Sequence, residues 1–77
     1  MDDSLLTVKD VAKIMKTNVN YVYSLIKKGY LPALKLGSLK IRKVSVDEFL
    51  EKYEGKDLTN LDVIKNLEVE GITNEKN

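Results

Sequence analysis

Residues 17–29 constrain the fold of this chain more than any other segment, because they have the start, the two edges and the end of one short helix. Asn18 can accept a hydrogen bond from the unpaired N–H groups of a first turn, and Gly29 suits the left-handed conformation that ends many helices. At 100° per residue, three apolar side chains fall on one edge, which predicts that this edge packs inward: Val22, Leu25 and Ile26.

The opposite edge of this helix is polar. It carries Asn20, Ser24 and Lys27, with Tyr21 and Lys28 beside them and Tyr23 at the boundary. Amide, hydroxyl and ammonium groups are those that form hydrogen bonds with base edges and phosphates in a major groove. A solvated helix can show the same polar edge, so a function has to be inferred from the neighbouring segments as well.

A shorter helix precedes this one. Thr7 can cap its first turn, and Asp10 three residues later completes a weaker form of the capping box. Apolar side chains then recur at helical spacing and predict a helix over residues 8–16: Val8, Val11, Ala12 and Met15. A turn at residues 16–18 joins the two helices, and this spacing is typical of a helix-turn-helix.

A β-hairpin is predicted after the second helix, because Pro32 forbids a helical continuation. Two alternating runs flank Gly37-Ser38. We expect the apolar members on or near the core side: Leu34, Leu36, Leu39 and Ile41. We expect Lys35, Lys40 and Arg42 to project the other way, as cations of a wing that contacts DNA. An ordinary hairpin with solvated lysines is the alternative.

A third helix is predicted to start at Ser45, because Ser45 and Glu48 have the spacing of a capping box. Gly55 ends it. We expect one face to close the core: Val46, Phe49, Leu50 and Tyr53. The other face is acidic and should point away from DNA: Asp47, Glu48, Glu51 and Glu54.

The net charge of +1 hides a strong asymmetry along the chain. Residues 4–46 carry nine Lys and Arg side chains and a single acid, whereas residues 47–77 carry nine acids and four bases. A basic block of this density favours an anionic polymer or surface as partner, although a solvated lysine-rich surface has the same composition.

Composition also excludes several classes of protein. The chain has no Cys and no His, which removes disulfides, Cys/His zinc sites and the usual general base, so we expect no enzyme, metal, cofactor or small-molecule substrate. No apolar run approaches the ~20 residues that span a bilayer, and an acidic start is unlike a signal peptide. We therefore expect a cytoplasmic protein with no membrane partner.

The order of these elements resembles the excisionase-type winged helix-turn-helix family, a relative of the MerR-like DNA-binding head. The resemblance covers residues 6–53. It rests on Leu6-Thr7-Val8-Lys9-Asp10-Val11-Ala12 for "L-T-x-x-E-x-A", Tyr23-Ser24-Leu25-Ile26-Lys27-Lys28-Gly29 for "Y-x-L-I-x-x-G", Leu31-Pro32 for "L-P", Leu36-Gly37 for the wing, and Val46-Asp47-Glu48-Phe49-Leu50 for the final helix. The chain departs from the family at Lys16-Thr17, where Gly and an apolar residue are frequent, and at Val19-Asn20-Tyr21, so the base preference does not carry over.

The resemblance implies a fold that is mostly α with a small β-hairpin (α+β), a winged helix-turn-helix whose second helix enters the major groove. We expect base-edge contacts from Asn20, Tyr21, Ser24 and Lys27, with Asn20 the best match to an adenine. We expect phosphate contacts from the hydroxyl of Tyr23 and from the cations Lys9, Lys16, Lys28, Lys35, Lys40, Arg42 and Lys43.

Residues 4–54 are thus predicted to form the DNA-binding domain, and residues 55–77 an acidic tail. Apolar residues at spacing three predict a short helix over residues 60–68 in this tail: Leu58, Leu61, Ile64 and Leu67. The tail can fold back on the core, pair with another copy, bind a recombinase or order on meeting a partner.

Three functions are compatible with the sequence. The first is an excision factor of a mobile element, which binds specific double-stranded DNA cooperatively, bends it and assists an integrase. The second is a small MerR-like transcriptional regulator of a mobile element. The third is a protein-interaction module that uses its acidic C-terminal third while the basic half is only solvated.

Overall fold

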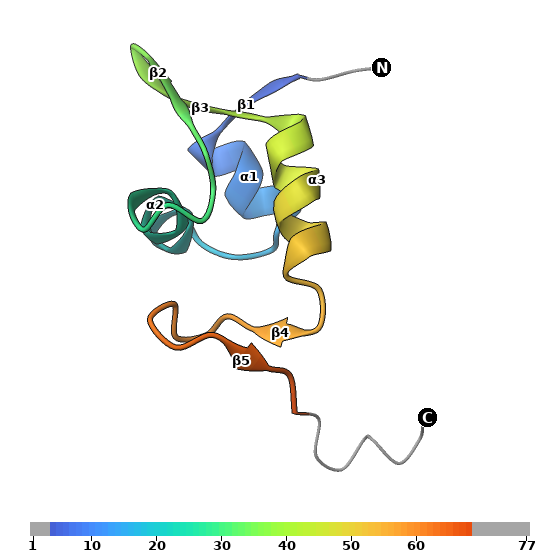
Figure 1. Cartoon of the computed structure of the whole chain (residues 1–77). Helices are drawn as coiled ribbons and strands as arrows, with labels where there is room; N and C mark the ends of the chain where they lie inside the picture. The colour runs from blue at the N-terminus through green and yellow to red at the C-terminus, as the bar shows by residue number, and fades with distance from the viewer. Residues whose placement is uncertain (1–3, 69–77) are drawn as a thin grey trace.

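The computed structural model describes residues 4–68, which form three helices and two small antiparallel sheets (Figure 1). In chain order the elements are β1 (Leu5–Thr7), α1 (Val8–Ile14), α2 (Val19–Lys27), β2 (Leu34–Leu36), β3 (Ser38–Arg42), α3 (Lys43–Lys52), β4 (Lys56–Asp57) and β5 (Lys65–Asn66). The winged helix-turn-helix predicted from the sequence is confirmed, and the predicted tail is described as far as residue 68. In that range no helix is long and apolar enough to cross a membrane.

Both predicted caps of the helix pair are present. The backbone N–H of Asp10 donates to the Thr7 hydroxyl at 3.0 Å, the backbone N–H of Thr7 donates to the Asp10 carboxylate at 3.0 Å, and the side chain of Asn18 accepts from the N–H of Tyr21 at 2.8 Å. In the turn between the helices Lys16 has φ 56°, which is the left-handed conformation that glycine adopts most easily. This explains how the chain makes the turn at a position where the family often has glycine.

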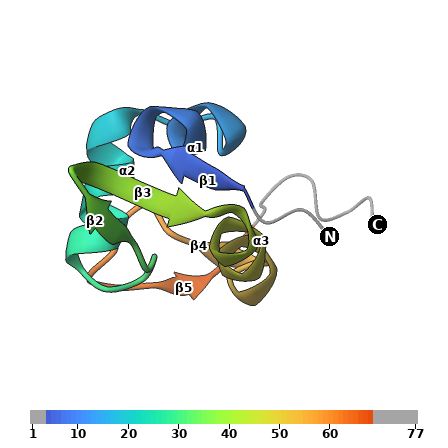
Figure 2. The same cartoon turned by 90° about the horizontal axis from the view of Figure 1, so that it is seen from above.

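The wing belongs to a three-stranded sheet with the order β1-β3-β2, and Figure 2 shows this sheet from above. The pairing of Leu6 with Ile41 in β1 and β3 was not predicted. Lys35 pairs with Leu39, so these two side chains share a face, while Leu34 pairs with Lys40 on the other. The predicted faces of β2 were therefore wrong: Leu34 and Leu36 are 43 % and 58 % exposed, and Lys35 lies on the core-facing side.

Helix α3 starts at Lys43, two residues before the predicted Ser45. Arg42 occupies its N-cap position with no side-chain cap bond, so the predicted capping box of Ser45 and Glu48 is wrong. The end of β3 leads directly into the first turn, which leaves Ser45 inside the helix. Val46 and Phe49 are buried as expected, whereas Leu50 is exposed because it lies outside the packed face.

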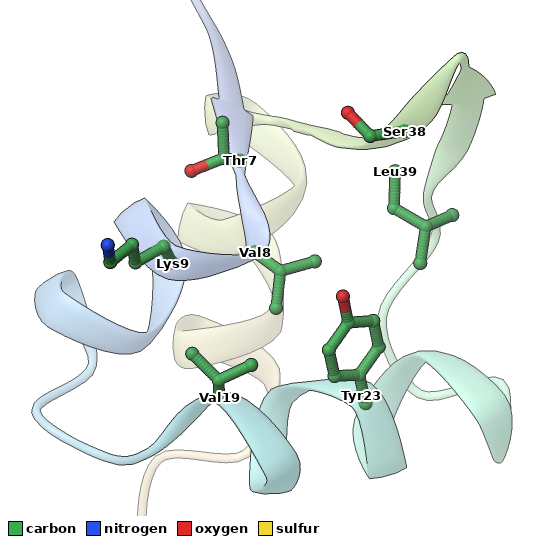
Figure 3. Close-up of a pocket in the computed structure, with 7 residues that line it drawn as sticks. All are labelled: Thr7, Val8, Lys9, Val19, Tyr23, Ser38 and Leu39. Atoms are coloured by element: carbon green, nitrogen blue, oxygen red, sulfur yellow. The ribbon is translucent and has the colours of Figure 1, made fainter.

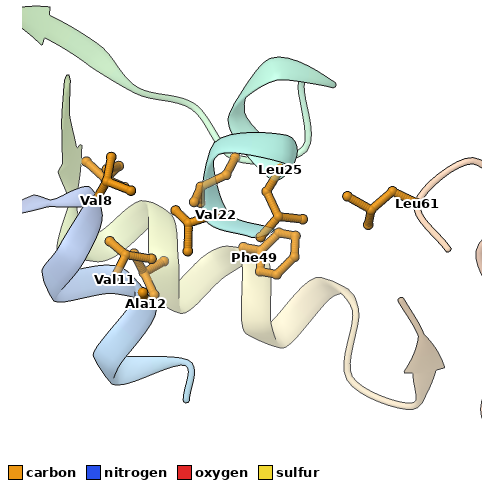
Figure 4. Close-up of a cluster of buried hydrophobic side chains, with 10 residues drawn as sticks. Val8, Val11, Ala12, Val22, Leu25, Phe49 and Leu61 are labelled. Atoms are coloured by element: carbon orange, nitrogen blue, oxygen red, sulfur yellow. The ribbon is translucent and has the colours of Figure 1, made fainter. Parts of the chain in front are cut away.

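The core lies where the three helices and β3 meet. Figure 4 shows side chains from α1, α2 and α3 packed together, with Leu61 reaching them from the C-terminal segment. The buried set is Val8, Val11, Ala12, Val22, Leu25, Leu31, Ile41, Val46, Phe49 and Leu61. The predicted apolar edges of the first two helices are thus confirmed. Leu5, at the start of β1, is half exposed and lies on the outer face of the sheet.

The C-terminal segment forms a hairpin, which corrects the predicted helix over residues 60–68. Strands β4 and β5 pair Lys56 with Asn66 and Asp57 with Lys65, and turns connect them. Asp57 accepts from the N–H of Thr59, and Asn60 accepts from the N–H of Asp62. These local bonds favour turns over a helix, because short polar side chains compete with the helical backbone bonds. Of the alternatives for the tail, folding back on the core is observed for residues up to 68.

Candidate nucleic-acid interface

The outer edge of α2 carries the side chains available for a ligand. Asn20 and Lys27 are exposed, and Tyr23 is 47 % exposed. Ser24 is half buried, and its hydroxyl donates to the carbonyl of Asn20 one turn earlier at 3.2 Å. A hydroxyl that donates to its own helix keeps only acceptor capacity for a partner. The edge therefore offers an amide, an ammonium and a phenol.

The C-terminal hairpin covers the flank of α2 that carries Tyr21 and Lys28. The Tyr21 hydroxyl donates to the carbonyl of Leu58 at 2.6 Å, and the Lys28 ammonium donates to Asp62 at 2.8 Å. Burial raises the pKa of the Tyr21 hydroxyl, and the hydrogen bond that the Lys28 ammonium donates to Asp62 raises the pKa of Lys28 above its ordinary value. Two predicted DNA contacts are thus engaged within the protein, and Figure 1 shows the hairpin below α2.

On its other flank, α2 faces the wing across a hollow of about 280 Å³ (Figure 3). Tyr23 points from α2 toward the wing, Leu39 points from β3 toward Tyr23, and Val19 points from α2 toward Val8. Val8 lies at the back, and polar side chains stand at the rim: Thr7, Lys9 and Ser38. The hollow therefore has an apolar floor and a polar edge.

The wing cations do not share one face. Because Lys35 pairs with Leu39, it lies on the face of the wing that looks toward α2. Lys40 and Arg42 lie on the opposite face, and the Lys40 ammonium donates to the Ser38 hydroxyl at 2.8 Å. Of these three cations, Lys35 is therefore the one on the same side of the wing as the exposed edge of α2.

The remaining predicted phosphate contacts differ in how they are held. Lys9 is exposed on the first turn of α1, at the rim of the hollow, and Lys16 is exposed in the turn before α2. Lys43 starts α3 and its ammonium donates to Asp47 at 2.9 Å. Lys9 and Lys16 thus border α2 on its N-terminal side, while Lys43 is paired on another helix.

Two apolar members of this surface, Val19 and Leu39, were not predicted as site residues. A helical wheel places Val19 only 40° from Tyr23, so the sequence could have indicated Val19 as a site residue. No sequence signal places Leu39 opposite Tyr23, because that contact depends on how the wing packs over α2. The bonds of Tyr21 and Lys28 to the C-terminal hairpin could not be predicted from a local pattern either, because they join residues far apart in the chain.

The assembled surface is suited to an elongated polyanion with polar groups on its edges. An exposed helix edge with an amide and an ammonium stands beside a basic two-stranded wing, and both are separated by a hollow. Among residues 4–68, no three His, Cys, Asp or Glu side chains gather into a possible metal site. The exposed side chains of α2 and the wing offer hydrogen bonds and positive charge, which DNA backbones and base edges require of a partner.

A model of a protein family described as a helix-turn-helix domain matches residues 5–54, about two thirds of the chain. The match begins at β1 and ends after α3, so it contains α2, the wing and the hollow between them. Comparison with curated proteins gave no match, and comparison with solved structures gave none.

Proposed function

This chain belongs to the helix-turn-helix domain family, associated with excisionase-like DNA-binding proteins, and it binds double-stranded DNA sequence-specifically; we propose that it does so as an excision factor of a mobile element. In this role several copies bind adjacent sites and bend the duplex, so that an integrase, the catalytic partner, assembles on it. Residues of α2 occupy the major groove and the wing contacts the neighbouring minor groove or its phosphates.

The observation that supports this proposal most is that α2 and the wing present polar and basic side chains on the same side of the molecule. Asn20 and Lys27 are exposed on α2, and Lys35 lies on the wing face that looks toward that helix. One duplex can therefore meet all three side chains at once. Asn20 is suited to the N6 and N7 of adenine, because an amide both donates and accepts.

The small size of the module argues for cooperation between copies. A single module of this kind buries roughly 600–1,000 Å² of protein surface on DNA, which gives low occupancy when it acts alone. Adjacent copies on repeated sites raise the occupancy, and bent DNA brings distant integrase sites together. Both properties suit an excision factor better than an isolated repressor.

Selection of bound sequences from random duplexes tests base recognition. We expect one short motif for the native chain and a flattened motif for Asn20→Ala, because loss of a bidentate base contact costs about 1–3 kcal/mol of discrimination. Lys16→Ala is the control, and it should weaken all sequences alike without changing the motif. An unchanged motif in Asn20→Ala would move base recognition to another surface.

The location of the selected motif separates the excision factor from the regulator. We expect repeated copies of the motif in the attachment arms of a mobile element, a bend in circularly permuted fragments, and stimulation of excision when integrase is added. A single motif in a promoter, with no bend and no effect on integrase, would support the transcriptional regulator and contradict the proposal.

A further inference from the structure

The hollow between α2 and the wing lies where a strand of bound DNA would pass. When α2 lies in a major groove and the wing reaches the neighbouring minor groove, the strand that separates the two grooves must pass between these elements. The hollow of about 280 Å³ occupies this place, between Val19 and Tyr23 of α2 and Leu39 of β3 (Figure 3).

Resting on the proposed function, we propose that this hollow holds one sugar–phosphate unit of that strand. The apolar floor of Val8, Val19 and Leu39 packs against the deoxyribose, and the Tyr23 hydroxyl donates to the adjoining phosphate, with Lys9 at the rim. The alternation of an apolar ring and an anion along a DNA strand matches the apolar floor and polar rim of the hollow.

The three tyrosines on and beside α2 differ in whether their hydroxyls are already bonded within the protein. The hydroxyls of Tyr21 and Tyr30 donate to the backbone carbonyls of Leu58 and Leu61 at 2.6 and 2.7 Å. Within residues 4–68, the Tyr23 hydroxyl has no such partner, and its side chain is 47 % exposed. Tyr23 is therefore the phenol left available for a phosphate oxygen.

The size of the hollow limits its occupant. Pockets for small molecules usually measure about 300–1,000 Å³ and enclose most of the ligand. This hollow is slightly smaller and open to solvent, so it suits one unit of a continuous chain. A base would need hydrogen-bonding groups in the floor, where the side chains are Val8, Val19 and Leu39.

A scan with single methylphosphonates, which remove the charge of one phosphate at a time, tests the proposal on the selected duplex. We expect the native chain to lose about tenfold in affinity at one phosphate of the strand between the two grooves, because a hydrogen bond to a charged oxygen is lost there. Tyr23→Phe should bind the unmodified duplex about tenfold more weakly and show no further loss at that phosphate.

Two variants complete the test. Tyr53→Phe is the matched control at the end of α3 and should keep the native affinity and the native scan. Val19→Ala should weaken all sequences about threefold, because it removes methyl groups that pack on the sugar. If Tyr23→Phe keeps the sensitive phosphate, or changes the selected motif instead, the hollow holds no backbone unit although DNA binding stands. If no duplex is selected at all, the proposed function itself fails.

Discussion

Two hairpins stand on either side of α2, and they are built and used in opposite ways. The wing, β2 and β3, is part of a three-stranded ladder, carries Lys35 and Lys40, and turns a face toward the exposed edge of α2. The C-terminal hairpin, β4 and β5, has two residue pairs in its ladder and is fastened to α2 by side chains.

This difference shows how one short helix divides its surface. On the wing side α2 presents Val19 and Tyr23 to an open hollow, whereas on the hairpin side Tyr21 and Lys28 are bonded to protein groups. The buried Leu61 anchors the second hairpin in the core. We infer that the wing provides a binding face in addition to its part in the core, where Ile41 is buried, whereas the second hairpin serves the fold.

The largest expected effect concerns Leu61. Leu61→Ala should lower the free energy of unfolding by about 2–5 kcal/mol, since the side chain is 7 % exposed and leaves a cavity. Leu36→Ala in the wing, where the side chain is 58 % exposed, should change it by less than about 0.5 kcal/mol. Urea denaturation measures both. Equal losses would mean that the C-terminal hairpin contributes no more to the fold than the wing tip does.

Removing one cation from each hairpin tests the division for DNA binding. Lys35→Ala should weaken binding roughly eightfold near 0.1 M salt and make the salt slope shallower by about 0.9, because one phosphate contact is lost. Lys65→Ala in β5 should leave both quantities unchanged. With about five phosphate contacts, the native slope should be about −4.5. A loss for Lys65→Ala as large as that for Lys35→Ala would show that both hairpins lie on DNA.

Tyrosine hydroxyls separate folding from binding on one helix. Tyr21→Phe should lower the free energy of unfolding by about 1 kcal/mol, because the Leu58 carbonyl loses its donor. The affinity of the folded protein for DNA should stay the same. Tyr23→Phe should show the reverse, with native stability in a thermal melt and weaker binding. If Tyr21→Phe binds DNA more weakly and keeps native stability, then the Tyr21 hydroxyl of the native chain contacts DNA instead of the Leu58 carbonyl.

A smaller effect is expected where the second hairpin neutralises a cation of α2. Asp62→Asn removes the carboxylate that pairs with Lys28, and both side chains are largely exposed. DNA binding should tighten by up to about fivefold at low salt, because an ion pair exposed to solvent is weak and is screened by salt. Asp47→Asn, which frees Lys43 on α3, is the matched control and should have less effect. Tightening by both to the same degree would point to net charge alone.

The smallest effect is a pH dependence that only the second of the two hairpins can contribute, because residues 34–42 of the wing contain no carboxylate. Hydrogen bonds from the hydroxyl and N–H of Thr59 hold the pKa of Asp57 below its ordinary value. The folded state then binds fewer protons than the unfolded state, so this contribution is present above the ordinary pKa of about 3.9 and is lost as pH falls through the lower folded value.

Denaturation at pH 2–5 measures this contribution. Asp57→Asn should flatten the acid end of the stability profile. At the lowest pH the variant should have the same stability as the native chain. Asp10→Asn is a useful comparison, because the backbone N–H and hydroxyl of Thr7 lower the pKa of Asp10 in the same way on α1. An unchanged profile for Asp57→Asn would mean that the turn keeps no bond to this carboxylate in solution.

What the sequence by itself determined was local. The caps at Thr7 and Asn18, the apolar edge of α2 and the end at Gly29 follow from bonds and periodicity within a few residues, and the structure has all of them. The polar edge with Asn20 and Lys27 followed from the same periodicity. These features depend on neighbours three or four positions apart, so a short window contains their cause.

What only the tertiary structure decided depends on residues far apart in the chain. The pairing of Leu6 with Ile41 fixed the sheet, and the register of Lys35 with Leu39 reversed the expected faces of β2. The hydroxyl of Tyr21, predicted to contact DNA, donates to the carbonyl of Leu58, which lies 37 positions away. Periodicity gives each segment two faces and cannot say which partner meets which face. Burial of a shared core makes that choice, because only one arrangement covers the apolar side chains of all segments together.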